Sequence, residues 1–131
     1  MKPFLLLAPR AHDEAAAAEY DSVRRHAGLA AADLVHLRVE SEPLPDLDLA
    51  DFSGVLLGGS SFNISDEDKS ELQLRVEADL GRLVDRIVDA DVPFLGMCYG
   101  VGTVTTHLGG TVDRTFAEPV GATRLTLTAD G

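Results

Sequence analysis

A single cysteine, Cys98, lies between two glycines at the junction of a predicted strand and a predicted helix. The apolar run of residues 92–95 leads into Gly96, and a second apolar stretch, 101–108, follows Gly100. Small residues two before and two after such a side chain let a strand turn sharply into a helix and present the side chain at a strained tip. The sequence therefore predicts a nucleophile elbow in an open α/β sheet, which fixes a strand–turn–helix unit at this point.

The predicted position of Cys98 also bears on its chemistry. Free amide groups and the helix dipole at a helix N-terminus favour the reactive thiolate over the neutral thiol. With 12 glycines in 131 residues, chance would place glycine on both sides of one cysteine about one time in a hundred. The alternative is a small buried hydrophobic side chain, but the strand, turn and helix signals around Cys98 favour the elbow.

The composition excludes several kinds of partner. Acidic residues outnumber basic ones by 22 to 11, so the surface should repel nucleic-acid phosphates. A lone cysteine allows no disulfide within the chain, and the apolar run at 4–8 is too short for a signal core or a membrane span. We therefore expect a cytoplasmic protein that binds neither nucleic acid nor a membrane.

Short apolar runs alternate with longer helical patterns, as in parallel sheets joined by crossover helices. The expected strands are 4–8, 33–39, 54–57 and 92–96, and the expected helices are 12–27, a helix from the turn at 65–68 to 88, and 101–108. Ser65 and the three acids after it are expected to cap the second helix. Residues 40–51 are expected to form a loop, and the alternation at 122–128 predicts a further strand with one solvated face. The fold class is α/β, with an open, mostly parallel sheet and helices on both faces.

Two glycine-containing loops leave the ends of predicted strands, one at Gly58-Gly59 and the other at Cys98. The carboxyl ends of parallel strands form the ligand crevice of an open sheet, so the two loops should meet there. A backbone amide from each loop would form an oxyanion hole for acyl transfer. Taken alone, Gly58-Gly59 is more simply a tight turn. A phosphate-binding loop is not indicated, because neither a P-loop nor a complete dinucleotide fingerprint occurs.

Several segments resemble the class I glutamine amidotransferases, most closely the free-standing members similar to the glutaminase half of GMP synthase. They are residues 56–60, 93–100, 108–112 and 118–121. The resemblance implies a flavodoxin-like glutaminase fold, of which residues 1–131 would be the N-terminal portion of a single domain. It implies L-glutamine as the substrate, an ammonia acceptor in another domain or protein, and no metal or organic cofactor.

The resemblance also assigns roles within the site. Cys98 would attack the side-chain amide and form a glutamyl thioester, while the backbone amides of Gly59 and Tyr99 hold the oxyanion. The positions expected to contact the substrate are Gly58, Ser60, Gly100 and Gly102.

A general base is harder to assign. The family carries its base and orienting carboxylate in a late His-x-Glu or His-Pro-Glu element, which does not occur in residues 1–131. His107 lies on the same predicted helix as Cys98, about 14 Å along its axis, so it cannot reach the thiol. His12 is expected at the surface near the crevice, His26 at the end of the first helix, and His36 packed within a strand. We expect the 131 residues alone to be nearly inactive and to associate through exposed apolar edges.

Two alternatives remain open from the sequence. One is the protease and deglycase branch of the same architecture, in which a histidine commonly follows the elbow cysteine and an acid near the first strand supports the thiol. Here Tyr99 follows the cysteine, and Arg10 and Asp13 lie after the first strand. The other is a non-catalytic binding or regulatory protein, which Gly102 favours because the family usually has glutamine at that position.

Overall fold

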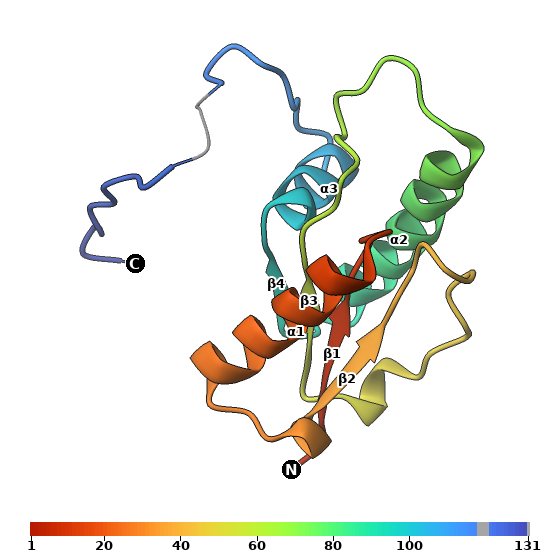
Figure 1. The fold of residues 1–131 in the computed structure, drawn as a ribbon, viewed down its shortest axis with the longest axis vertical. Helices are drawn as coiled ribbons and strands as arrows, with labels where there is room; N and C mark the ends of the chain where they lie inside the picture. Colours follow the sequence, from red (N-terminus) through yellow and green to blue (C-terminus); the bar gives the residue numbers. More distant parts are fainter. Residues whose placement is uncertain (118–120, 131) are drawn as a thin grey trace.

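The computed structural model describes residues 1–117 and 121–130, and its core is a four-stranded parallel sheet (Figure 1). The strands are β1 (Phe4–Leu7), β2 (Leu34–Leu37), β3 (Gly54–Leu57) and β4 (Phe94–Gly96), in the spatial order β2-β1-β3-β4. The helices are α1 (Asp13–Ala27), α2 (Glu71–Asp89) and α3 (Tyr99–His107), with short 3-10 turns at Ala31–Asp33 and Leu49–Asp51. The α/β class and the parallel sheet predicted from the sequence are confirmed.

The helices cover opposite faces of the sheet. Successive side chains of a strand point to opposite faces, and Leu5 and Leu7 of β1 join the core cluster that includes Val76 and Leu80 of α2. On the other face the Tyr20 ring of α1 stacks on a histidine of β2. Because β1 is covered on both sides, it contains only apolar residues, as expected for a central parallel strand.

The C-terminal end of α1 follows from its sequence. His12 occupies the N-cap position, and Gly28 ends the helix in a left-handed conformation with φ of 66°. Glycine adopts that conformation without steric cost. The predicted bounds of this helix are therefore confirmed to within one residue.

The start of α2 differs from the prediction. Ser70, not Ser65, is its N-cap, and the Ser70 hydroxyl accepts a hydrogen bond from the Gln73 amide at 3.1 Å. The acids after Ser65 precede the helix, because the Asp66 carboxylate accepts the Asn63 amide at 2.9 Å and so closes a separate turn. The helix therefore begins five residues later than its sequence signals indicated.

The strand predicted at 122–128 is wrong. These residues have no regular secondary structure, and Leu125 and Leu127 are 83% and 80% exposed. Alternation stabilises a strand only where a neighbouring strand completes its hydrogen bonds, and within the described residues no strand pairs with this segment. The segment 118–121 quoted for the family resemblance lies mostly outside the described residues.

Candidate active site

The loops after β1, β3 and β4 lie next to one another at the carboxyl edge of the sheet. The parallel ladder continues beyond the strands, because the Gly58 amide donates to the Leu7 carbonyl at 2.9 Å. The Met97 amide likewise donates to the Leu57 carbonyl at 2.8 Å. The two glycine-containing loops predicted from the sequence therefore leave the same edge of the sheet from adjacent strands.

Cys98 has the strained backbone expected of a sharp strand-to-helix turn. It is the N-cap of α3, with φ of 54° and ψ of −107°, and a positive φ is uncommon for residues other than glycine. A Cβ atom on Gly96 would lie 2.8 Å from the Gly100 carbonyl oxygen, and one on Gly100 would lie 2.5 Å from the Leu57 carbonyl oxygen. Both glycines are thus required by the packing of the turn, and the thiol itself is exposed.

A cavity of about 480 Å³ opens beside Cys98. Its lining residues are Ser60, Phe62, Asn63, Ile64, Ser65, Cys98, Tyr99, Val101, Gly102, Thr105, Thr111, Val112, Asp113 and Phe116. The walls are apolar side chains interrupted by hydroxyl groups, with one carboxylate and no lysine or arginine. Such a lining suits a small ligand that is held by a few polar groups.

The predicted site residues divide between this cavity and its surroundings. Ser60, Tyr99 and Gly102 line the cavity together with Cys98, whereas Gly58, Gly59 and Gly100 are not part of its lining. The Tyr99 side chain is only 5% exposed and belongs to the core cluster. Burial raises the pKa of Tyr99, so its phenol stays neutral, and its backbone amide is the part suited to the predicted role.

The amide of Gly59 has a partner that the sequence did not indicate. It donates a 2.9 Å hydrogen bond to Oε2 of Glu19, a residue of α1 whose side chain is 14% exposed. Arg10 pairs with the same oxygen at 3.0 Å. Gly59 therefore already has an acceptor in this structure, and its oxyanion role at Cys98 stays a prediction.

Glu19 and Arg10 also lie close to the two glycines of this loop. A Cβ atom on Gly58 would lie 2.7 Å from the Glu19 carboxyl carbon, and one on Gly59 would lie 3.1 Å from the Arg10 guanidinium carbon. The sequence signal for this contact is an acid three residues after Ala16, on the buried face of α1. An acid on a buried helix face usually has a specific partner.

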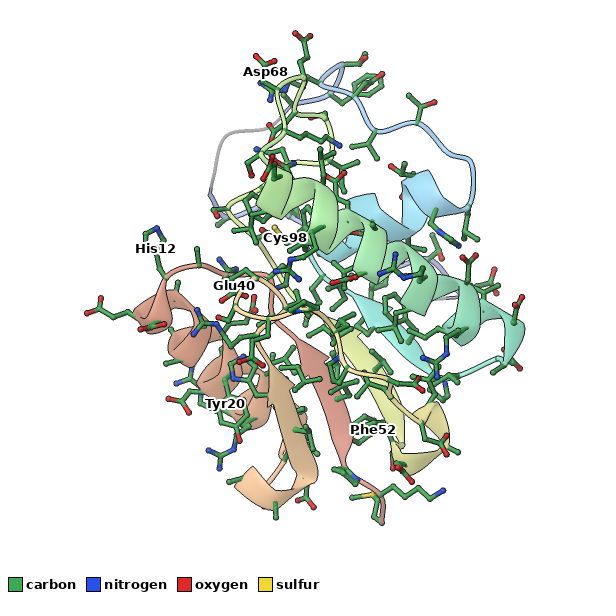
Figure 2. The ribbon with its side chains drawn as sticks, turned by 90° about the vertical axis from the view of Figure 1, so that its right-hand side faces the viewer. His12, Tyr20, Glu40, Phe52, Asp68 and Cys98 are labelled. Atoms are coloured by element: carbon green, nitrogen blue, oxygen red, sulfur yellow. The ribbon has the colours of Figure 1, made fainter. Side chains whose placement is uncertain are left out.

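The four histidines lie outside the lining of the cavity. His12 is exposed at the start of α1, and its side chain points away from Cys98 (Figure 2). His26 bonds to the Ser22 carbonyl oxygen within α1. His36 stacks on Tyr20 with ring centroids 5.1 Å apart, and burial lowers its pKa. His107 lies 2.8 Å from Asp85 of α2.

Gly102 is in close contact with the opposite wall of the cavity. A Cβ atom at this position would lie 3.1 Å from Cγ1 of Ile64. A glutamine here, as in the family pattern, would therefore require Ile64 to move.

Within the part of the chain that the structure describes, no group of three histidine, cysteine or acidic side chains could hold a metal ion. No helix there is long and apolar enough to cross a bilayer.

Comparison with solved structures identifies the class to which the fold belongs. The crystal structure of a glutamine amido transferase from Methylobacillus flagellatus matches 83% of this chain with a TM-score of 0.57. The match covers 39% of that chain at 22% sequence identity, so the likeness is one of fold. The fold is that of a class I glutamine amidotransferase-like domain.

The sequence comparisons indicate a more particular relationship. Over 50 residues, 38% of this chain, it is 48% identical to the glutamine-hydrolyzing GMP synthase of Streptomyces avermitilis. Over 62 residues it is 36% identical to the enzyme of the same name from Listeria monocytogenes. Each match spans 10% of the relative's length. No family model matches the chain.

Proposed function

We propose that the chain is the N-terminal portion of a glutaminase domain that releases ammonia from L-glutamine. The observation that carries the proposal is the strained, exposed Cys98 at the carboxyl edge of the sheet, beside a cavity of about 480 Å³. The partial sequence likeness to glutamine-hydrolyzing GMP synthases supports glutamine as the substrate. We further propose a cytoplasmic location, since the one cysteine permits no disulfide within the chain.

The proposed reaction has two steps. The Cys98 sulfur attacks the side-chain carbonyl carbon of glutamine, and the resulting tetrahedral intermediate expels ammonia to leave a glutamyl thioester. Water then attacks the thioester, releasing glutamate and restoring the thiol. In both steps charge develops on the carbonyl oxygen, which the amide of Tyr99 and a second backbone amide would stabilise.

The cavity supplies groups for binding, but no histidine that could act as the general base. Hydroxyls such as Ser60 and Thr111 can accept or donate hydrogen bonds, and Asp113 can pair with the ammonium group of an amino acid. None of the four histidines lines the cavity. We propose that the general base comes from residues beyond the 131, in keeping with the 39% coverage of the solved amidotransferase.

The test is release of glutamate from L-glutamine by the complete gene product, with Cys98→Ala as the control variant. The proposal expects turnover that is lost in Cys98→Ala, and little turnover from residues 1–131 alone. Folded complete protein that binds no glutamine and releases no glutamate would contradict the proposal. Robust turnover by residues 1–131 would show that the base lies within them, and His12 would be the first residue to replace.

A further inference from the structure

The Arg10–Glu19 pair contacts the loop that is expected to hold the reacting oxygen. Oε2 of Glu19 accepts bonds from the Gly59 amide at 2.9 Å and from Arg10 at 3.0 Å. Its second oxygen, Oε1, is buried and has no hydrogen-bond partner among the described residues. The Glu19 carboxyl group, paired with Arg10, therefore lies directly against one of the two amides expected to hold the oxyanion.

The backbone of Arg10 is held in turn by the side chain of a second arginine, Arg38. Arg38 donates from Nε and Nη2 to the Arg10 carbonyl oxygen at 3.2 and 2.7 Å. The Arg38 guanidinium is held by Glu40, whose side chain is 5% exposed, at 2.5 Å. A continuous set of contacts thus runs from the end of β2 through Arg10 and Glu19 to the loop after β3.

The position of Glu19 has a consequence for acyl transfer. An amide hydrogen that is bound to a carboxylate is not free to stabilise a substrate oxyanion, and hydrogen bonds to charged acceptors are among the stronger ones. A carboxylate beside the developing oxyanion would also repel it. The amide can therefore act on a substrate only after the carboxylate has moved away.

We propose that Glu19, held by Arg10, is a positioning residue that occupies the Gly59 amide in the resting protein and releases it when the substrate oxygen arrives. The inference rests on the proposed function. It assigns to Glu19 control over the oxyanion hole rather than contact with the reacting atoms. Weakening the acceptor at this position should therefore speed reactions at Cys98 that develop an oxyanion, and leave other reactions of the thiol unchanged.

The test compares Glu19→Gln with Glu14→Gln, which removes the same charge from an exposed position of the same helix. Two reagents modify Cys98. A chloromethyl ketone derived from glutamine places a carbonyl oxygen in the site, whereas methyl methanethiosulfonate reacts at sulfur without forming an oxyanion. We expect Glu19→Gln to react about tenfold faster with the ketone and at the wild-type rate with the thiosulfonate, and Glu14→Gln to match wild type with both.

Backbone amide NMR supplies a readout that does not depend on activity. The Gly59 amide proton should lie downfield in the wild type and move upfield in Glu19→Gln, where a neutral acceptor replaces the carboxylate. If Glu19→Gln does not fold, Glu19→Asp serves instead, because the shorter carboxylate retreats from Gly59 while keeping its charge.

The outcomes separate the inference from the proposed function. An unchanged Gly59 resonance, or equal ketone rates in wild type and Glu19→Gln, overturns the inference alone. Parallel changes with both reagents mean that the loop has merely loosened, which also overturns it. A ketone that labels neither protein, while the thiosulfonate labels both, overturns the proposed function and the inference with it.

Discussion

Replacing Gly100 by alanine should destabilise the turn around Cys98. The new Cβ atom would lie 2.5 Å from the Leu57 carbonyl oxygen and 3.2 Å from the Leu57 Cβ and Cγ atoms. The nearest of these atoms is backbone of a central strand, which cannot retreat as a flexible side chain would. The Leu57 carbonyl also accepts the Met97 amide at 2.8 Å, so any shift disturbs that bond as well.

Two opposing effects set the change in the free energy of unfolding that Gly100→Ala should cause. Forcing extra volume into a packed site costs about 1–3 kcal/mol, while alanine gains up to about 1 kcal/mol over glycine in a helix. We expect a net loss of about 1–2 kcal/mol in the free energy of unfolding. Gly81 of α2 is the matched control, because a Cβ atom there meets nothing within 4 Å. Gly81→Ala should stabilise the protein by about 0.5–1 kcal/mol.

The assay is urea unfolding followed by circular dichroism for wild type and both variants. We expect a lower urea midpoint for Gly100→Ala and a higher one for Gly81→Ala. The dependence of the unfolding free energy on urea concentration should be the same in all three proteins. If Gly100→Ala were as stable as Gly81→Ala, the packing argument for the glycine after Cys98 would be refuted.

Two further predictions use the same unfolding measurement. Ser70→Ala should lower stability by about 1 kcal/mol through loss of the α2 cap, whereas Ser65→Ala should change it little; the reverse order would contradict the observed helix start. Burial, and then the charge of Arg38, lowers the pKa of His36, so the unfolded chain binds a proton more readily than the folded one. Stability should therefore hold above about pH 6.5 and fall as the pH drops below it; a His36→Asn variant with an unchanged acid-side loss would contradict this assignment.

The sequence predicted the sheet well because its strands depend on local composition. The run Phe4–Leu7 is apolar throughout, and Gly28 ends α1 through its own backbone freedom. These features depend on residues that are close in the sequence and not on contacts with distant segments. The same holds for the glycines around Cys98, whose spacing predicted a sharp, strained turn, and Cys98 has φ of 54°.

Features that depend on distant partners could not be predicted in this way. Ser65 was the predicted cap of α2, but Asp66 bonds instead to Asn63 and Gln73, and the helix begins after Ser70. The strand predicted at 122–128 failed because alternation does not guarantee a neighbouring strand. The role of Glu19 was not predicted, because the partners of this acid lie 9 and 40 residues away in the sequence.

We propose that Cys98 is an activated nucleophile in a site that recognises glutamine. The most direct test is intact-protein mass spectrometry after treatment with a diazo-ketone analogue of L-glutamine at neutral pH. We expect one adduct per chain, located on Cys98, formed faster than on free cysteine and slowed by added L-glutamine. Labelling no faster than that of free cysteine, or labelling that L-glutamine leaves unchanged, would contradict it.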